Sequence, residues 1–170
     1  MAYLRNGDVF YRSTVPATAV DYAVDTSMLR TYDVIRDVTI VRDQPVTWTN
    51  LTNVSTNASG GLTAGTLPGT SYSAGASSVE TIDSSGSVSF SVATAPTPRM
   101  LVGLNDGADN TTGYAELDYA LYLSPTGAVR VYEDGSLKCR TQSACDWFDS
   151  VAADDVFTID RRGDTVSYLR

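Results

Sequence analysis

Short segments of alternating apolar and polar residues, separated by turn signals, most constrain the fold of this chain. In Ser87–Val92, for example, Val88, Phe90 and Val92 fall on one face. Alternation with a period of two is typical of half-buried strands. No segment keeps a helical period over eleven residues. The sequence therefore predicts an all-β protein, and its many short strands favour a two-sheet antiparallel, jelly-roll-like β-sandwich.

Strands are expected wherever apolar or alternating segments recur. These segments are Asp8–Ser13, Val34–Arg42, Val46–Asn50, Ala76–Ile82, Ser87–Val92, Arg99–Leu104, Ala115–Leu123, Ala128–Glu133, Asp155–Asp160 and Thr165–Leu169. Asp134-Gly135 predicts a tight turn. Asp25–Arg30 and Asp146–Val151 could each form one helical turn. Thr56–Ser73 is rich enough in Gly, Thr and Ser to predict a long loop or an irregular edge of a sheet. Pro96-Thr97-Pro98 is expected to be a connection, because proline cannot lie within a central strand.

Length and charge narrow the class of protein. The 170 residues suit a single domain, residues 1–170. The net charge is −8, and only Lys138 of the twelve basic residues is a lysine. An acidic chain without a basic stripe gains little on nucleic acid and is repelled by anionic membranes, and no apolar stretch approaches the ~20 residues of a membrane helix. We therefore expect no nucleic-acid partner and no membrane insertion.

The two ends of the chain repeat one another. Tyr168-Leu169-Arg170 matches Tyr3-Leu4-Arg5, and the first copy continues into Asn6-Gly7. Asn-Gly between alternating segments is the strongest short signal of a β-hairpin. The N-terminal hairpin, residues 3–13, is therefore expected to complete a sheet with the C-terminal strand, residues 164–170. Coincidence is the alternative, since three matching residues are a weak match by themselves.

This repetition fits one period of a tandem array cut inside a hairpin, and it equally fits a circular permutation whose termini lie close together. In both cases the C-terminal strand and the N-terminal hairpin belong to the same neighbourhood, where the two copies of Tyr-Leu-Arg could compete for one position. The displaced copy could pair with another molecule, which predicts head-to-tail assembly through Tyr3, Leu4, Arg5, Asn6, Gly7, Tyr168, Leu169 and Arg170.

Several segments resemble, in permuted order, a concanavalin-like (lectin/glucanase-type) jelly-roll module of repetitive bacterial and phage surface proteins: Val46–Val54, Ala74–Ser78, Arg99–Leu104, Leu117–Leu123 and Val129–Gly135. Gly163–Tyr168 and Tyr3–Gly7 look like the split halves of that module's Tyr-x-x-Asn-Gly hairpin. The resemblance implies a two-sheet sandwich used for carbohydrate recognition, adhesion or spacing, with sugar contacts made by loops and the concave sheet. It assigns no binding residue to this chain.

Catalysis is not expected. The glucanases of the resembling family carry Glu-x-Asp-x-(x)-Glu on one strand, and here Glu116 and Asp118 would share a face. The positions of the second glutamate hold Ala120 and Leu121, although a retaining glycosidase needs both carboxylates. The chain has no histidine, no nucleophile–base pair and no phosphate-binding loop. Glu116 and Asp118 are interpreted as ordinary polar residues of a strand.

Two weaker site predictions concern ligands. Asn105, Asp106 and Asp109 lie in an oxygen-rich loop that could hold Ca²⁺, the one cofactor the sequence suggests; the alternative is a solvated loop with Asx turns. Tyr72 and Tyr114 lie beside Gly-rich loops and, with Asn110, could contact a sugar; the alternative is core packing.

Cys139 and Cys145 are six residues apart and could form a disulfide or remain free thiols in a reducing compartment. The Ser/Thr-rich, Lys-poor composition favours the disulfide and an extracellular, cell-surface or virion-surface location. The first hypothesis for function is a non-enzymatic structural or adhesive module, a repeat or subunit of a surface fibre or filament, whose partners are copies of itself or neighbouring repeats. The alternative is a lectin-like domain whose partners are glycans.

Overall fold

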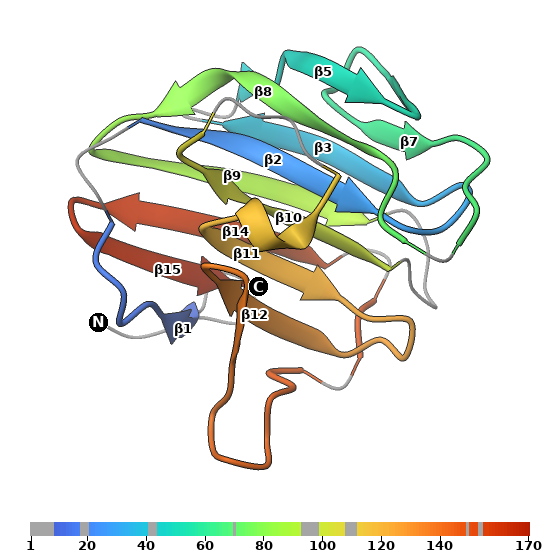
Figure 1. Ribbon diagram of the computed structural model, residues 1–170. Helices are drawn as coiled ribbons and strands as arrows, with labels where there is room; N and C mark the ends of the chain where they lie inside the picture. The colour runs from blue at the N-terminus through green and yellow to red at the C-terminus, as the bar shows by residue number, and fades with distance from the viewer. Residues whose placement is uncertain are drawn as a thin grey trace.

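The chain folds as two antiparallel β-sheets packed face to face (Figure 1). The computed structural model describes residues 9–17, 21–40, 44–69, 71–92, 99–107, 112–148, 150–152 and 155–170. The all-β, two-sheet class predicted from alternation is confirmed, and the architecture is compatible with a jelly-roll-like fold.

The first sheet has the strand order β1 (Val9–Arg12), β15 (Thr165–Leu169), β14 (Val156–Arg162), β9 (Ser85–Val92), β3 (Val34–Ile40), β7 (Leu62–Ala64) and β6 (Val54–Thr56), and β4 (Gln44–Pro45) also pairs with β3. The second sheet has the order β13 (Ser136–Lys138), β12 (Val129–Glu133), β11 (Tyr119–Leu123), β10 (Met100–Asn105), β2 (Tyr22–Met28), β8 (Gly75–Ile82) and β5 (Trp48–Thr52). The strands nearest the two ends of the chain, β1 and β15, thus lie side by side at one edge of the first sheet.

Alternation places one apolar face of each sheet in the shared core. On β9, Val88, Phe90 and Val92 are buried, while β10 contributes Met100 and Val102 from the opposite sheet. Burying one such side chain stabilises the fold by about 1.5–3 kcal/mol. The core between the sheets therefore carries most of the stability, as in other sandwiches.

A second, smaller cluster lies on the outer face of the second sheet. Leu101 and Ala120 are buried there beneath Leu117. Leu117 follows a single 3₁₀ turn, η1 (Tyr114–Glu116), which lies across this sheet in Figure 1. The second sheet is consequently covered on part of both faces.

Two local predictions are wrong. Asp25–Arg30 is not a helical turn, because residues through Met28 belong to β2, a strand held between β10 and β8. The strand expected at Ala115–Leu123 begins only at Tyr119. For Thr56–Ser73 the structure favours the irregular edge over the long loop, because the three-residue strand β7 lies within it, next to the edge strand β6.

The described part of Asp146–Val151 contains no helix; Phe148 instead forms an isolated bridge with Val129. The Asp-Gly turn is confirmed: Asp134 (φ 49°) and Gly135 (φ 67°) join β12 to β13, both with the positive φ of a type I′ turn. Pro96–Pro98 lies outside the described residues. Within those residues, no helix has the length and apolar character needed to span a membrane.

Candidate functional site

The candidate site is the seam where β1, near one end of the chain, pairs with β15, at the other. Val9 opposes Leu169, Tyr11 opposes Tyr168, and the register shifts between them. A two-residue turn placed after Arg170 would set Leu169 opposite Val9, which is the observed partner. The Val9–Leu169 pair therefore matches the register of an Asn-Gly hairpin, whereas Tyr11–Tyr168 and Arg12–Ser167 lie one residue out of it, beyond the shift of register. Tyr3, Leu4, Arg5, Asn6 and Gly7 lie outside the described residues, so their part in the hairpin stays a prediction.

Aromatic side chains hold β1 against the rest of the molecule. The ring of Phe10 lies 4.7 Å from that of Phe148, edge-on, and the ring of Tyr11 lies 4.9 Å from Trp147 and 5.5 Å from Tyr168. We call these five residues the aromatic clamp. Each such pair contributes about 0.5–1.5 kcal/mol beyond its buried area. The clamp joins β1 to β15 and to the segment that follows β13.

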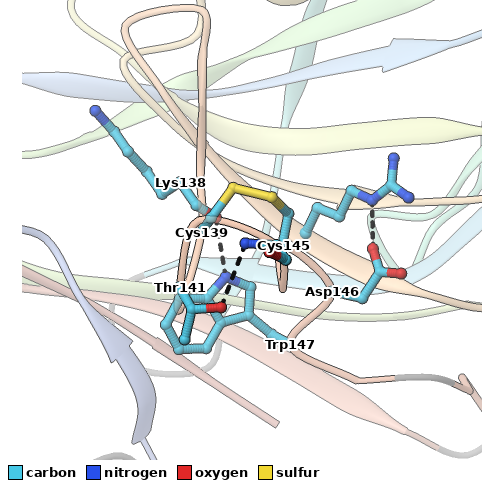
Figure 2. Close-up of a disulfide and its surroundings, with 8 residues drawn as sticks. Lys138, Cys139, Thr141, Cys145, Asp146 and Trp147 are labelled. Carbon is cyan, nitrogen blue, oxygen red and sulfur yellow. Dashed lines mark hydrogen bonds and ion pairs between the residues drawn. A yellow bond between two sulfur atoms is a disulfide. The ribbon is translucent and has the colours of Figure 1, made fainter.

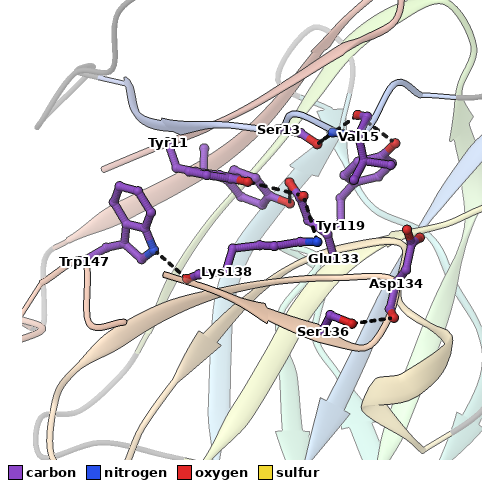
Figure 3. Close-up of polar contacts among 10 residues, drawn as sticks. Tyr11, Ser13, Val15, Tyr119, Glu133, Asp134, Ser136, Lys138 and Trp147 are labelled. Carbon is purple, nitrogen blue, oxygen red and sulfur yellow. Dashed lines mark hydrogen bonds and ion pairs between the residues drawn. The ribbon is translucent and has the colours of Figure 1, made fainter. Parts of the chain in front are cut away.

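A buried carboxylate connects the same strands to the second sheet (Figure 3). Glu133, at the end of β12, has no exposed surface. The Tyr11 hydroxyl donates to its Oε2 at 3.4 Å, the Tyr168 hydroxyl donates to its Oε1 at 3.3 Å, and Lys138 Nζ lies 3.8 Å away. Both tyrosines thus serve the clamp through their rings and Glu133 through their hydroxyls.

Burial governs the ionisation of this group. It raises the pKa of Glu133, against the lowering effect of its hydrogen bonds and of Lys138. Burial, followed by the nearby Glu133 charge, raises the pKa of Tyr11 to about 12 and also raises the pKa of Tyr168. Both hydroxyls therefore keep their protons at neutral pH. If β1 leaves, Glu133 loses a donor, which is costly for a buried carboxylate.

Cys139 and Cys145, for which the sequence favours a disulfide, are joined by one in the structure (Figure 2). The bridge closes a projecting loop after β13 whose residues 139–144 are exposed. Trp147 follows this loop in the sequence, and its indole Nε1 donates a hydrogen bond to the Lys138 carbonyl at 3.2 Å. The guanidinium of Arg140 lies 5.8 Å from the Trp147 ring centroid. The disulfide loop therefore positions the indole that packs against Tyr11.

The structure brings two of the predicted sugar-binding residues together. The rings of Tyr72 and Tyr114 lie 5.9 Å apart, edge to face, on the outer face of the second sheet. Asn110, the third, lies outside the described residues. The seam and this outer face are separate regions, because none of the clamp residues lines the pocket that contains Tyr72 and Tyr114.

The residues predicted to bind calcium engage protein groups. The Asn105 amide donates to Asp25 Oδ2 at 3.1 Å, and its Oδ1 accepts from Gly107 N at 2.7 Å. The backbone N–H of Asp106 donates to Asp118 Oδ2 at 2.8 Å. Over the described part of the chain, no group of three His, Cys, Asp or Glu side chains could hold a metal ion. Asp109 lies outside that part, and the calcium site stays a prediction.

The sequence predicted that Glu116 and Asp118 share one face of a strand, but neither residue lies in a strand. Glu116 ends η1, and Asp118 precedes β11. Burial raises the pKa of Asp118 to about 6. The strand expectation is wrong here because the 3₁₀ turn interrupts the alternation.

Sequence reasoning missed the buried carboxylates. Glu133 has the same parity on its strand as Val129 and Val131, so an inward-facing acid was visible in the alternation. Asp25 was hidden by the expected helical turn. It is 1% exposed, accepts hydrogen bonds from Thr26 N, Asn105 and Ser77, and has a pKa raised by burial to about 6.

Comparisons of this chain with protein-family models, with curated proteins and with solved structures found no match. Its function is therefore argued from its own residues, above all from the pairing of its two ends.

Proposed function

We propose that this chain is a non-enzymatic structural or adhesive module that joins copies of itself, or neighbouring modules, head to tail through β1 and β15. One observation carries the proposal: β1 pairs with β15, with Val9 opposite Leu169 as an Asn-Gly hairpin would place it. The sequence repeats Tyr-Leu-Arg directly before Asn6-Gly7 and at residues 168–170, so two segments can take the position beside β1. The strand beside β15 can therefore be supplied by any copy that carries the same N-terminal segment.

The chemistry of the seam supports exchange between copies. A second copy offers the same Phe10 and Tyr11, so its β1 could fill the clamp and donate to Glu133 as the chain's own β1 does. Reciprocal exchange gives a closed dimer, whereas exchange in one direction gives an open fibre. Strand addition of this kind draws its affinity from backbone hydrogen bonds and its specificity from side-chain pockets.

The same proposal places the module outside the cytoplasm, at a cell or virion surface, in a concanavalin-like jelly-roll family. The Cys139–Cys145 disulfide supports an oxidising location. The two-sheet antiparallel sandwich supports the family at the level of architecture. The permuted order of the resembling segments agrees with the pairing of β1 and β15.

Light scattering and electron microscopy of the concentrated protein test the proposal. We expect the mass to rise with concentration in multiples of 18.2 kDa and fibres or rings to appear. Val9→Asp puts a charge at a buried position of β1 and should keep the chain monomeric, whereas Val79→Asp, at a 60% exposed valine, should assemble like the wild type. A wild type that stays at 18.2 kDa up to its solubility limit contradicts assembly of this chain.

A second candidate function is lectin-like carbohydrate binding, supported by the tyrosine-lined pocket on the outer face of the second sheet. Aromatic rings beside hydroxyl donors are suited to sugars, which present both C–H faces and hydroxyl groups. A glycan array read with and without Ca²⁺ tests it. We expect binding to a restricted set of glycans, and an array without any binder contradicts this function.

A further inference from the structure

The pocket on the outer face of the second sheet is lined by a continuous row of tyrosines. Tyr72 meets Tyr114, Tyr114 meets Tyr132, and Tyr132 meets Tyr122, each pair with ring centroids 5.9 Å apart and edge to face. The pocket has a volume of about 240 Å³. This lies below the ~300–1,000 Å³ of sites for drug-sized ligands, so the pocket suits one ring rather than a long chain.

The base of the pocket is apolar and firmly packed. Leu101, on β10, is 1% exposed and lies directly opposite Tyr122 on β11. Burial raises the pKa of Tyr72 and of Tyr132 above the ordinary tyrosine value, so both hydroxyls remain neutral at physiological pH. The walls therefore offer ring faces and neutral hydroxyl groups over a hydrophobic floor.

Two arginines give the pocket a positive character. Arg130 faces Tyr122 across the sheet and is paired with Asp146. Arg99 is different: its Nε is shielded from solvent and has no hydrogen-bond partner among the described residues, where it also forms no ion pair. A buried donor without a partner is unfavourable, and most such groups in proteins are satisfied.

The charge around Arg99 contrasts with that of the whole chain. The chain carries a net charge of −8, yet no Asp or Glu lines this pocket. Guanidinium groups bind carboxylate, sulfate and phosphate through charge-assisted hydrogen bonds. Arg99 lines the pocket, so an anionic group on the ligand would give its guanidinium the ion-pair partner that the described protein residues do not.

We propose that this pocket binds an acidic sugar, with one ring against the tyrosines and its carboxylate or sulfate hydrogen-bonded to Arg99. The inference rests on the second candidate function, ligand binding by this face, and names the ligand class. The tyrosine hydroxyls bind the sugar hydroxyls, and the guanidinium selects the charged ring. Carboxylated and sulfated sugars share this chemistry.

Calorimetric titration distinguishes these possibilities with four ligands: a galacturonate trisaccharide, its methyl ester, a galactose 6-sulfate oligosaccharide, and inorganic sulfate. The ester keeps the ring and removes the charge. We expect at least one acidic sugar to bind about tenfold or more tightly than the ester, since one charge-assisted hydrogen bond accounts for that ratio. We also expect inorganic sulfate to bind more weakly than the preferred sugar.

Two substitutions assign the preference to Arg99. Arg99→Gln should remove the preference for the acid over the ester, and Arg99→Lys should retain only part of it because it keeps the charge without the planar fork. Arg36→Gln makes the same change in net charge at an exposed arginine of β3, in the first sheet, and should leave binding unchanged. Circular dichroism verifies that each variant is folded; if Arg99→Gln is not, Arg99→Lys carries the test.

Each contrary result identifies what fails. Equal affinity for the acids and the ester, or an unchanged preference in the folded Arg99 variant, overturns the acidic-sugar inference and leaves lectin-like binding standing. Inorganic sulfate binding as tightly as the best sugar overturns the sugar part. If neither the acids nor the ester binds, the acidic-sugar inference is wrong, and the glycan array alone decides the lectin-like function.

Discussion

Two strand pairs of the first sheet differ in the length and continuity of their pairing. β14 and β9 pair in an unbroken register from Val156 opposite Ser91 to Arg162 opposite Ser85. Phe157 and its partner on β9 are buried and stacked. β1, at the edge of the same sheet, pairs only briefly with β15, with a shift of register after Val9.

The difference indicates which part of the molecule the proposed exchange between copies would use. The central pair is fixed by a continuous backbone ladder and by the core, so separating it means unfolding the domain. β1 depends on the aromatic clamp and on hydrogen bonding to Glu133, which are side-chain contacts that another copy can reproduce. We therefore expect β1 to open at a lower free energy than the sandwich.

The largest effect is expected at the centre. Phe157→Ala removes a fully buried ring that stacks at 5.7 Å on Phe90, and should lower the free energy of unfolding by about 3–5 kcal/mol. Phe10→Ala, at a half-buried ring of β1, should cost clearly less. Urea unfolding followed by tryptophan fluorescence measures both. Equal losses would mean that β1 is an integral part of the core.

The second prediction concerns the pH dependence of stability at Asp25, which is buried on β2 of the second sheet. Because burial raises the pKa of Asp25 from 3.8 to about 6, the stability associated with its neutral form is fully present below pH about 4 and is lost as the pH rises through about 6. The loss attributable to Asp25 is about 3 kcal/mol. Asp25→Asn should remove it, so the variant should gain stability relative to wild type between pH 4 and pH 7.

This gain is measured as the difference between urea unfolding curves of the two proteins at each pH, which cancels the titration of the other carboxylates. A difference that does not change with pH would show that Asp25 is ionised throughout, held so by its three hydrogen-bond donors.

The disulfide should contribute less, and mainly at the seam. Replacing Cys139 and Cys145 together with serine opens a short loop and should cost about 2 kcal/mol in the chain-entropy model. Trp147 then loses its fixed position beside Tyr11. Hydrogen exchange should therefore accelerate in β1 more than in β9 and β14. Uniform acceleration along the chain would contradict a local role for the loop.

The smallest effect is expected at the Glu133 hydrogen bond. Tyr11→Phe removes one donor to a buried carboxylate and should cost about 1 kcal/mol. Tyr32→Phe, at a 73% exposed tyrosine, is the matched control and should cost nothing measurable. Chemical denaturation compares the two variants with wild type. If both behave alike, Tyr11 holds β1 through its ring alone.

Alternation predicted the fold class because the strands bury alternate residues in the core, as in Ser87–Val92 and Val129–Glu133. It failed in β2, where Asp25 and Ser27 are buried on an outer face that a distant segment covers and supplies with partners. The repeated ends pointed to the seam although they lie at opposite ends of the chain, because a repeated Tyr-Leu-Arg beside Asn-Gly can be recognised without knowing the fold.

The tyrosine-lined pocket was predictable from the sequence only in part. The sequence pointed to Tyr72 and Tyr114 because each lies beside a Gly-rich segment. The positions of Arg99 and Tyr132 near them depend on the pairing of β10, β11 and β12, and no local pattern encodes which cation lacks a partner.

The central claim is that the β1 position beside β15 can be filled by another copy. The direct test mixes two single variants, Val9→Cys and Leu169→Cys, under mild oxidation that leaves Cys139–Cys145 intact, and resolves the products by non-reducing electrophoresis. Because these residues oppose one another, exchange predicts covalent heterodimers. A mixture of Ser89→Cys and Thr158→Cys, which oppose one another in the central pair, should stay monomeric. If the first mixture yields no more heterodimer than the second, β1 is not exchanged and the account is wrong.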